Sequence, residues 1–259
     1  MKRTLVTVLG SAALLVAVSP TAKADAFMSL QNGATIVSCN TSLPINVAGN
    51  CLVAQGFTAI FGANEIDFVG TVGGYLINDI ALTSNSPGNG ALAFATDTKT
   101  AVANISAGAT ALTVLFAVNN FALPAGSPLT LSASQAATFI NAAALTSQNF
   151  FGWGNALNTL GAGPGNGTLV TTPDCVNPAA APPENACASV GAPVLFARAG
   201  LFALNGREII NLNQGGIANF QGTIAVTPPN VIPEPSSLIL LATGLFGLVG
   251  GRRMFRRNA

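Results

Sequence analysis

Carboxylates are the first candidates for chemistry in this chain, because it contains no histidine. That absence excludes Ser-His-Asp and Cys-His catalysis and the zinc sites that use imidazole ligands. Glu65 and Asp67 lie two positions apart, so they would share one face of a strand. Paired carboxylates can hydrolyse a glycosidic bond across a cleft, and three further acids could join them: Asp79, Glu184 and Glu208. The spacing favours a solvated strand edge instead.

Lys99 is the other side chain that could act as a nucleophile, since it follows Thr96, Asp97 and Thr98. A lysine in such a role must be buried and deprotonated. The surrounding segment is polar and typical of a hairpin, so we expect Lys99 to be exposed to solvent. With no recognisable nucleophile–base pair, we predict no catalytic residue, no metal site and no cofactor.

An aromatic cluster, Phe150-Phe151-Gly152-Trp153, contains the single tryptophan of the chain. Core packing is the interpretation that we favour, since aromatic rings bury large apolar surfaces. A small exposed patch that binds sugar is the alternative.

The four cysteines form two pairs of equal spacing, Cys39 with Cys51 and Cys175 with Cys187. Four cysteines allow three pairings, and the short separations make local closure the least costly in entropy. Zinc sites built from four cysteines usually contain C-x-x-C knuckles, which are absent here. We therefore predict two local disulfides in an oxidising compartment.

Charge is sparse and unevenly placed along the chain. Between Asp25 and Ile232 there are eight acidic residues against three basic ones, Lys99, Arg198 and Arg207. A mildly acidic central segment has no basic patch for a phosphate backbone. Nucleic acid is therefore excluded as an expected partner.

Short strand-like runs separated by turn signals predict an all-β, sandwich-like domain over residues 25–230. The run 66–83 is rich in β-formers around Gly73-Gly74, which predicts a turn or bulge. Residues 110–118 are apolar on both faces, as expected of a central strand. Residues 220–227 alternate apolar and polar before Pro228, as in a strand with one wet face.

One short helix is predicted inside the domain, ending before Asn149. Ser132 and Gln135 have the spacing of a capping box. Apolar residues then recur at helical intervals: Ala133, Ala136, Ala137, Ile140 and Ala144.

The N-terminal residues 1–24 have the three parts of a secretory signal peptide. Lys2 and Arg3 precede an apolar run, and Ala22-Lys23-Ala24 matches the small-residue site of a signal peptidase. We predict a signal helix that is cleaved to leave Asp25 as the first residue. A signal anchor that stays uncleaved is the alternative.

The C-terminal residues 231–259 combine a Pro-Glu-Pro triplet, an apolar run and a basic end. Pro233 and Pro235 favour extended chain around Glu234. The uncharged run that follows predicts a short transmembrane helix of about 24 Å, which is less than a typical bilayer core of about 30 Å. By the positive-inside rule, the domain faces outward, because four basic residues mark the cytoplasmic end: Arg252, Arg253, Arg256 and Arg257.

This tail closely resembles the PEP-CTERM sorting signal, in which Pro-Glu-Pro, a short transmembrane helix and a basic cluster follow one another at the end of an exported chain. The resemblance covers about the last 27 residues and implies recognition by an exosortase, a membrane cysteine protease or transpeptidase of Gram-negative bacteria that make exopolysaccharide. Pro233, Glu234 and Pro235 would form the sorting motif. A plain membrane anchor is the alternative.

The sequence thus predicts an exported protein whose partners are signal peptidase, exosortase and, transiently, the inner membrane. We expect the domain to face outward at the inner membrane until the tail is cleaved, and then to reach the cell surface or extracellular space. Its expected role is structural, in an extracellular matrix where exopolysaccharide is a candidate partner. A secreted domain that binds or cleaves carbohydrate is the alternative.

Overall fold

The structure is a computed structural model, and it describes residues 23–59, 65–108, 110–161, 167–179 and 184–229. Residues 1–22 of the predicted signal peptide and the predicted transmembrane helix lie outside these residues, and residues 23 and 24 are described as non-helical chain. Within the described part of the chain, no helix is long and apolar enough to cross a membrane.

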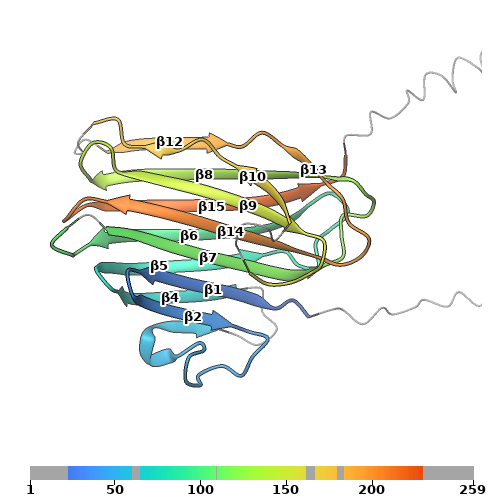
Figure 1. Ribbon diagram of the computed structural model, residues 1–259, viewed down its shortest axis with the longest axis horizontal. Coiled ribbons are helices and arrows are strands. Elements are labelled where there is room, and N and C mark those ends of the chain that lie inside the picture. Colours follow the sequence, from blue (N-terminus) through green and yellow to red (C-terminus); the bar gives the residue numbers. More distant parts are fainter. Residues whose placement is uncertain (1–22, 60–64, 109, 162–166, 180–183, 230–259) are drawn as a thin grey trace, which may run out of the picture.

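Two antiparallel sheets pack face to face as a sandwich, which confirms the predicted all-β class (Figure 1). The first sheet contains β1 (Ala26–Asn32), β2 (Thr35–Asn40), β7 (Thr110–Phe121), β9 (Ser147–Asn155), β10 (Thr168–Thr171), β11 (Cys175–Val176) and β14 (Phe202–Leu212). Its order is β10-β9-β14-β7-β1-β2, and β11 also pairs with β9.

The second sheet is built from the remaining strands. These are β3 (Phe57–Ala59), β4 (Glu65–Val72), β5 (Tyr75–Ser84), β6 (Ala93–Asn104), β8 (Leu129–Asn141), β12 (Asn185–Val190), β13 (Val194–Phe196) and β15 (Ile217–Thr227). Their order is β12-β8-β15-β6-β5-β4-β3, and β13 also pairs with β8.

The strands form where the sequence pattern has a period of two. β15 alternates buried and partly exposed residues over its whole length and ends just before Pro228, as predicted. β7 is central, between β14 and β1; Leu112, Val114, Phe116 and Val118 are buried on one face, and the other face is largely half-buried. Gly73 and Gly74 form the turn between β4 and β5. The core is thus the layer of side chains between the sheets.

The helix predicted from Ser132 onward is wrong, since this segment is the strand β8. Its buried residues alternate strictly, with Leu131, Ala133 and Gln135 facing inward. β8 pairs along its length with β15 and β12. The capping-box spacing and alanine content were weak local signals, and sheet pairing overrode them. Of the described residues, only the 3-10 turn η1 (Val53–Gln55) is helical.

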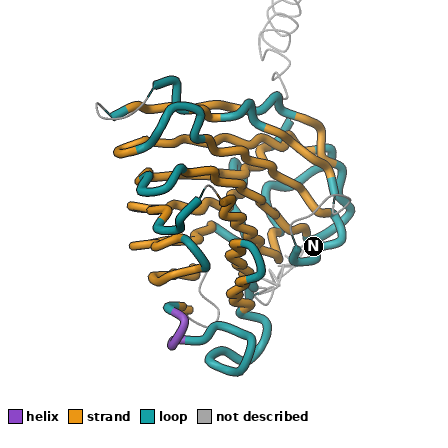
Figure 2. The backbone as a smooth tube through the Cα atoms, turned by 60° about the vertical axis from the view of Figure 1, so that its left-hand side comes forward, coloured by secondary structure: helices purple, strands orange, loops and turns teal. Residues whose placement is uncertain are grey.

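The chain enters and leaves the sandwich at the same end. β1 begins and β15 ends on one side of the stacked strands in Figure 1. Figure 2 shows the stacked strands and, in purple at one end of the molecule, the turn η1, which packs beside β3. The two flanking segments therefore start from one end of the domain.

Candidate functional site

Three charged side chains meet in the core between the two sheets. Asp97 and Lys99 come from β6 of the second sheet, and Glu208 comes from β14 of the first. Lys99 Nζ donates to Asp97 Oδ2 and to Glu208 Oε2. All three side chains are 0% exposed. We call Asp97, Lys99 and Glu208 the interior cluster; its amine joins carboxyls from opposite sheets.

Neighbouring strands supply hydrogen bonds to the two carboxyls. The backbone N–H of Gly222, which lies opposite Asp97 in the register of β15 and β6, donates to Asp97 Oδ1 at 3.2 Å. Gln148 Nε2, from β9, donates to Glu208 Oε1 at 2.7 Å and to the Gln221 carbonyl at 3.0 Å. Each carboxyl therefore has one oxygen on the amine and the other on a neutral donor.

Glycine at position 222 leaves the space that the interior cluster occupies. A Cβ there would lie 2.7 Å from the ring of Phe150 and 2.9 Å from Asp97 Oδ1. Both distances are shorter than ordinary van der Waals contact. The small residue lets the Asp97 carboxyl and the Phe150 ring lie over β15.

Burial shifts the proton affinities within the interior cluster. Loss of water raises the pKa of Glu208 to about 7, although Lys99 acts in the opposite direction. Burial also raises the pKa of Asp97, again against the effect of Lys99. For Lys99, burial acts to lower the pKa, but the two carboxyls outweigh it and hold the pKa above its ordinary value. At neutral pH the carboxylic acid and the carboxylate of Glu208 are therefore both populated.

The prediction that Lys99 is exposed is wrong. Its side chain is among the largest that are fully buried. The physical reason is pairing, because two carboxyls satisfy an amine that would otherwise be too costly to bury. The period of two in β6 contained the signal: Thr96 and Thr98 face outward, so Asp97 and Lys99 must face inward.

Glu208 was named only as one acid that could join Glu65 and Asp67, and its pairing with Lys99 was missed. In β14, Leu204, Glu208 and Ile210 lie on the same inward face. An acid in the middle of a buried apolar series requires a partner. That pattern could have indicated an interior acid, but nothing in it specifies which strand of the facing sheet supplies the cation.

The exposed carboxylates form a second group, on the outer face of the second sheet. Glu65 and Asp67 share this face of β4, and Asp79 lies diagonally across on β5, two positions from the residue opposite Asp67. Partial burial, then Glu65, then Asp79 raise the pKa of Asp67. We call Glu65, Asp67 and Asp79 the outer acids.

The five acids considered from the sequence do not come together. Glu184 is exposed just before β12, and Glu208 is in the core. Two shallow hollows on the second sheet are lined by residues of β6, β8, β12 and β15 and include none of these acids. In the described ranges, no group of three or more Cys, Asp or Glu side chains is arranged to hold a metal ion.

The aromatic cluster divides between the two faces of β9. Phe150 points into the core, where its ring stacks on Phe116 at 6.0 Å. Phe151 and Trp153 stack on each other on the opposite face, and the Arg207 guanidinium lies 4.6 Å and 5.7 Å from their ring centres. Trp153 is only 2% exposed. Core packing is thus confirmed for Phe150, and burial of Trp153 leaves it no open aromatic face.

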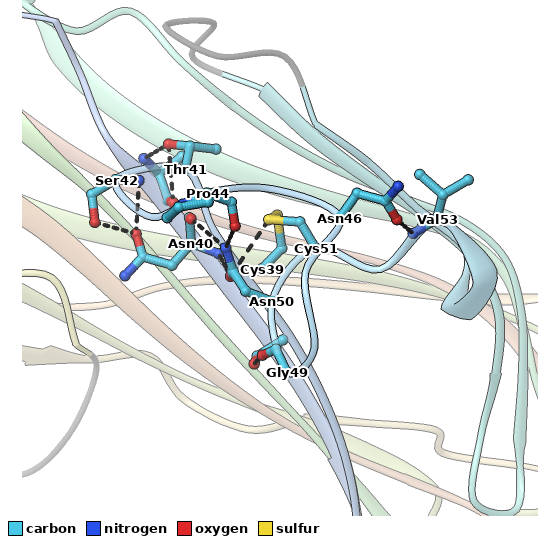
Figure 3. The surroundings of a disulfide bond; sticks show 12 residues. Cys39, Asn40, Thr41, Ser42, Pro44, Asn46, Gly49, Asn50, Cys51 and Val53 are labelled. Carbon is cyan, nitrogen blue, oxygen red and sulfur yellow. Dashed lines mark hydrogen bonds between the residues drawn. A yellow bond between two sulfur atoms is a disulfide. The ribbon is translucent and has the colours of Figure 1, made fainter.

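Both predicted disulfides are present. Cys39–Cys51 closes the loop after β2, where the Asn50 side chain accepts from Asn40 N–H and donates to the carbonyls of Asn40 and Pro44 (Figure 3). This bond is local, as the spacing suggested.

The second disulfide, Cys175–Cys187, has a role that the spacing did not reveal. Cys175 lies in β11, which pairs with β9 of the first sheet, and Cys187 lies in β12, which pairs with β8 of the second. The bond joins cysteines that are only 12 positions apart, yet it links the two sheets covalently.

Comparison with protein families identifies the PEP-CTERM protein-sorting motif over residues 231–257. The matched segment contains Pro233, Glu234 and Pro235 and lies outside the described residues. The resemblance stated from the sequence is thus confirmed. The motif implies processing by an exosortase, export and attachment at the cell surface.

No curated protein matches this chain. Seven chains of solved structures match, among them "Structure of infectious bursal disease virus Gx strain", with 12% identity and a TM-score of 0.28. That match covers 80% of this chain and 51% of the viral chain, so this chain spans about half the length of the viral one. So loose an overlap assigns neither fold nor function.

Proposed function

We propose that this PEP-CTERM-bearing chain is a structural protein of the cell surface or extracellular matrix. The observation that carries the proposal is the sorting motif over residues 231–257. In this account a signal peptidase releases the N-terminus, the tail holds the protein at the inner membrane with its domain outside, and an exosortase cleaves near Pro233–Pro235. Exopolysaccharide is the candidate partner of the released domain.

The sandwich is consistent with cleavage at both ends. β1 begins at Ala26, one residue after the proposed N-terminus, and the Asp25 N–H donates to Asn119 Oδ1 at 2.7 Å. At the other end, β15 finishes at Thr227, ahead of Pro233. Removal of residues 1–24 and of the tail would leave every described strand intact.

A structural role, rather than an enzymatic one, fits the distribution of polar groups. The outer acids lie on the outer face of the second sheet, and within the described residues no salt bridge involves any of them. The interior cluster is closed to any external substrate, because its side chains are 0% exposed. Polysaccharide hydrolysis by the exported protein, lost on Glu65→Gln or Asp67→Asn, would favour the carbohydrate-cleaving alternative and overturn this proposal.

The sorting proposal is tested by changing Pro233 and Pro235 to Ala together. Alanine permits helix through Glu234 and removes the extended conformation that proteases generally bind, while the apolar run is unchanged. In an exosortase-bearing host, cell fractionation should find this variant uncleaved in the membrane and the wild type released or on the surface.

The matched control changes Pro228 and Pro229, which end β15, to Ala. This pair lies outside the matched motif, so processing should be unchanged. Equal release of wild type and the Pro233/Pro235 variant would mean that the triplet is not recognised and that the tail is a plain anchor.

The four arginines are proposed to orient the tail as a stop-transfer signal. By insertion scales, each costs about 2.5–3.5 kcal/mol at the centre of a membrane helix. The variant changes all four to Asn: Arg252, Arg253, Arg256 and Arg257. A fraction of its tails should cross the membrane or misorient, and protease accessibility of the C-terminus would measure that fraction.

A further inference from the structure

The interior cluster places a primary amine against two carboxyls in a site without solvent. Lys99 Nζ contacts Oε2 of Glu208 from the facing sheet and Oδ2 of Asp97 from its own strand. None of the three side chains is exposed. Well-oriented intramolecular reactants can reach effective concentrations of about 10⁵–10⁸ M. An amine and a carboxyl in this position are the two reactants of an amide condensation.

We propose that Lys99 Nζ condenses with the Glu208 carboxyl to form an intramolecular amide that covalently joins the two sheets, and that Asp97 moves the protons. This inference concerns a modification within the sandwich and is independent of how the protein is sorted.

The hydrogen bonds distinguish the roles of the two carboxyls. Gln148 Nε2 donates to Glu208 Oε1 at 2.7 Å, where a negative charge would develop in a tetrahedral intermediate. Glu208 Oε2 faces the amine and is the leaving oxygen. Asp97 is held through Oδ1 by the Gly222 N–H, which leaves Oδ2 directed at Nζ to accept its proton.

The reaction balances without any external reagent. It starts from an ammonium on Lys99, a carboxylate on Asp97 and a carboxylic acid on Glu208, a form that a pKa of about 7 keeps populated at neutral pH. Asp97 takes one proton from Nζ, and the amine lone pair attacks Cδ of Glu208 to form the N–C bond. As the C–Oε2 bond breaks, Asp97 gives its proton to the leaving oxygen and takes the second proton from nitrogen. The products are a secondary amide, protonated Asp97 and one water molecule.

Burial favours the product over the reactants. An ammonium and a carboxylate in an apolar core carry a desolvation cost of several kcal/mol for each ion. The amide is neutral, and its carbonyl can keep the hydrogen bond from Gln148.

The structure also indicates what the bond would do. Cys175–Cys187 already links the sheets at the β11–β12 side. An amide between β6 and β14 would add a second link in the middle of the sandwich, and unlike the disulfide it would survive reducing agents. Unfolding could then no longer separate the two sheets completely.

The experiment is a reduced tryptic map of the exported and folded protein. Between Lys23 and Arg252, trypsin can cut only after Lys99, Arg198 and Arg207. An acylated lysine is not a trypsin site. The proposal therefore predicts complete loss of cleavage after Lys99, together with a branched product in which the Lys99 peptide is joined to the peptide that begins at Glu208, lighter by one water than the sum of the two.

Three variants assign the chemistry. Lys99→Arg retains a cation but removes the nucleophile, so this variant should form no branched product and lose no water. Asp97→Asn keeps the nucleophile and the Glu208 carboxyl but removes the proton acceptor, so most of the branched product should be lost. Glu65→Gln, on the outer face, is the matched control and should yield the branched product as fully as the wild type.

The wild-type map decides the matter even if the interior variants fail to fold. Full cleavage after Lys99 in wild-type protein that circular dichroism shows to be β-structured would overturn the proposal. A link from Lys99 to Asp97 would overturn the pairing with Glu208. Water loss that persists in Lys99→Arg would place the dehydration elsewhere and would equally contradict it.

Discussion

The interior cluster and the outer acids use the same residue types to opposite effect. Asp97 and Glu208 are buried, share one lysine and each accept a further hydrogen bond. The outer acids face water on the second sheet, and among the described residues the charges that raise the pKa of Asp67 are those of Glu65 and Asp79. A carboxylate therefore joins the sheets or remains a solvated surface group according to the strand face on which it lies.

The comparison also separates the two places where sequence reasoning sought catalysis. Glu65 and Asp67 were considered for their spacing, and the structure leaves them in the open. Lys99 was expected to be exposed, and the structure buries it against two carboxyls. The amine and the carboxyls come together only because two sheets bring distant residues into contact, and that juxtaposition is absent from any single segment.

Removal of the lysine is the strongest way to test the role of the interior cluster. Lys99→Met leaves two carboxyls in the core without a cation, and breaking a buried pair in this way costs about 3–5 kcal/mol. If the cluster has condensed, the same substitution removes the covalent link between the sheets, so stability decreases in either case. Urea unfolding followed by Trp153 fluorescence should show this decrease in the free energy of unfolding.

The outer acids provide the matched control for that substitution. Glu65→Gln is an exposed change and should alter the free energy of unfolding by no more than about 0.5 kcal/mol. Equal small effects of Lys99→Met and Glu65→Gln would contradict the distinction between the two groups.

A smaller effect is expected when the space around the interior cluster is reduced. Gly222→Ala forces Phe150 or Asp97 to move, because its Cβ would lie within 3 Å of both. Overpacking of this kind costs about 1–3 kcal/mol. Gly90→Ala is the control, since a Cβ at Gly90 has no neighbour within 4 Å. Thermal unfolding that lowers Tm equally in both variants would show that the crowding at Gly222 is not the cause.

The smallest change in the free energy of unfolding is expected at the outer acids, and there the substitution should stabilise the fold rather than destabilise it. Asp67→Asn removes a carboxylate that Glu65 and Asp79 repel, so at neutral pH and low salt it should stabilise the fold by about 0.2–0.5 kcal/mol. The pKa of Asp67 is raised in the folded state by partial burial and then by these neighbours, so its ionisation lowers stability as pH rises through that pKa.

The stabilisation by Asp67→Asn should therefore be absent in acid, where Asp67 is protonated in the folded and the unfolded state, and should decrease in high salt. Urea unfolding at acidic and neutral pH measures both effects. A loss of stability at neutral pH would show instead that Asp67 makes a favourable contact.

Much of the architecture follows from local sequence pattern. Alternation predicted β15 and its end at Pro228, and Gly73-Gly74 predicted the turn between β4 and β5. Equal spacing predicted both disulfides. These features depend on residues that are close in sequence, where period and loop closure act directly.

Features that depend on pairing between distant strands could not be predicted in the same way. Gln135 and its neighbours have helical spacing, but β15 and β12 impose a strand. Lys99 and Glu208 are 109 positions apart, and nothing local to either names the other. The sheet-to-sheet role of Cys175–Cys187 likewise depends on which strands β11 and β12 join.

The central claim, that an exported domain is released from a PEP-CTERM tail, is tested most directly by the intact mass of the protein recovered from the cell surface or medium. One measurement locates both ends of the chain. The account predicts a chain that begins at Asp25 and ends near Pro233–Pro235. A recovered chain that still carries Arg252–Arg257 would contradict it.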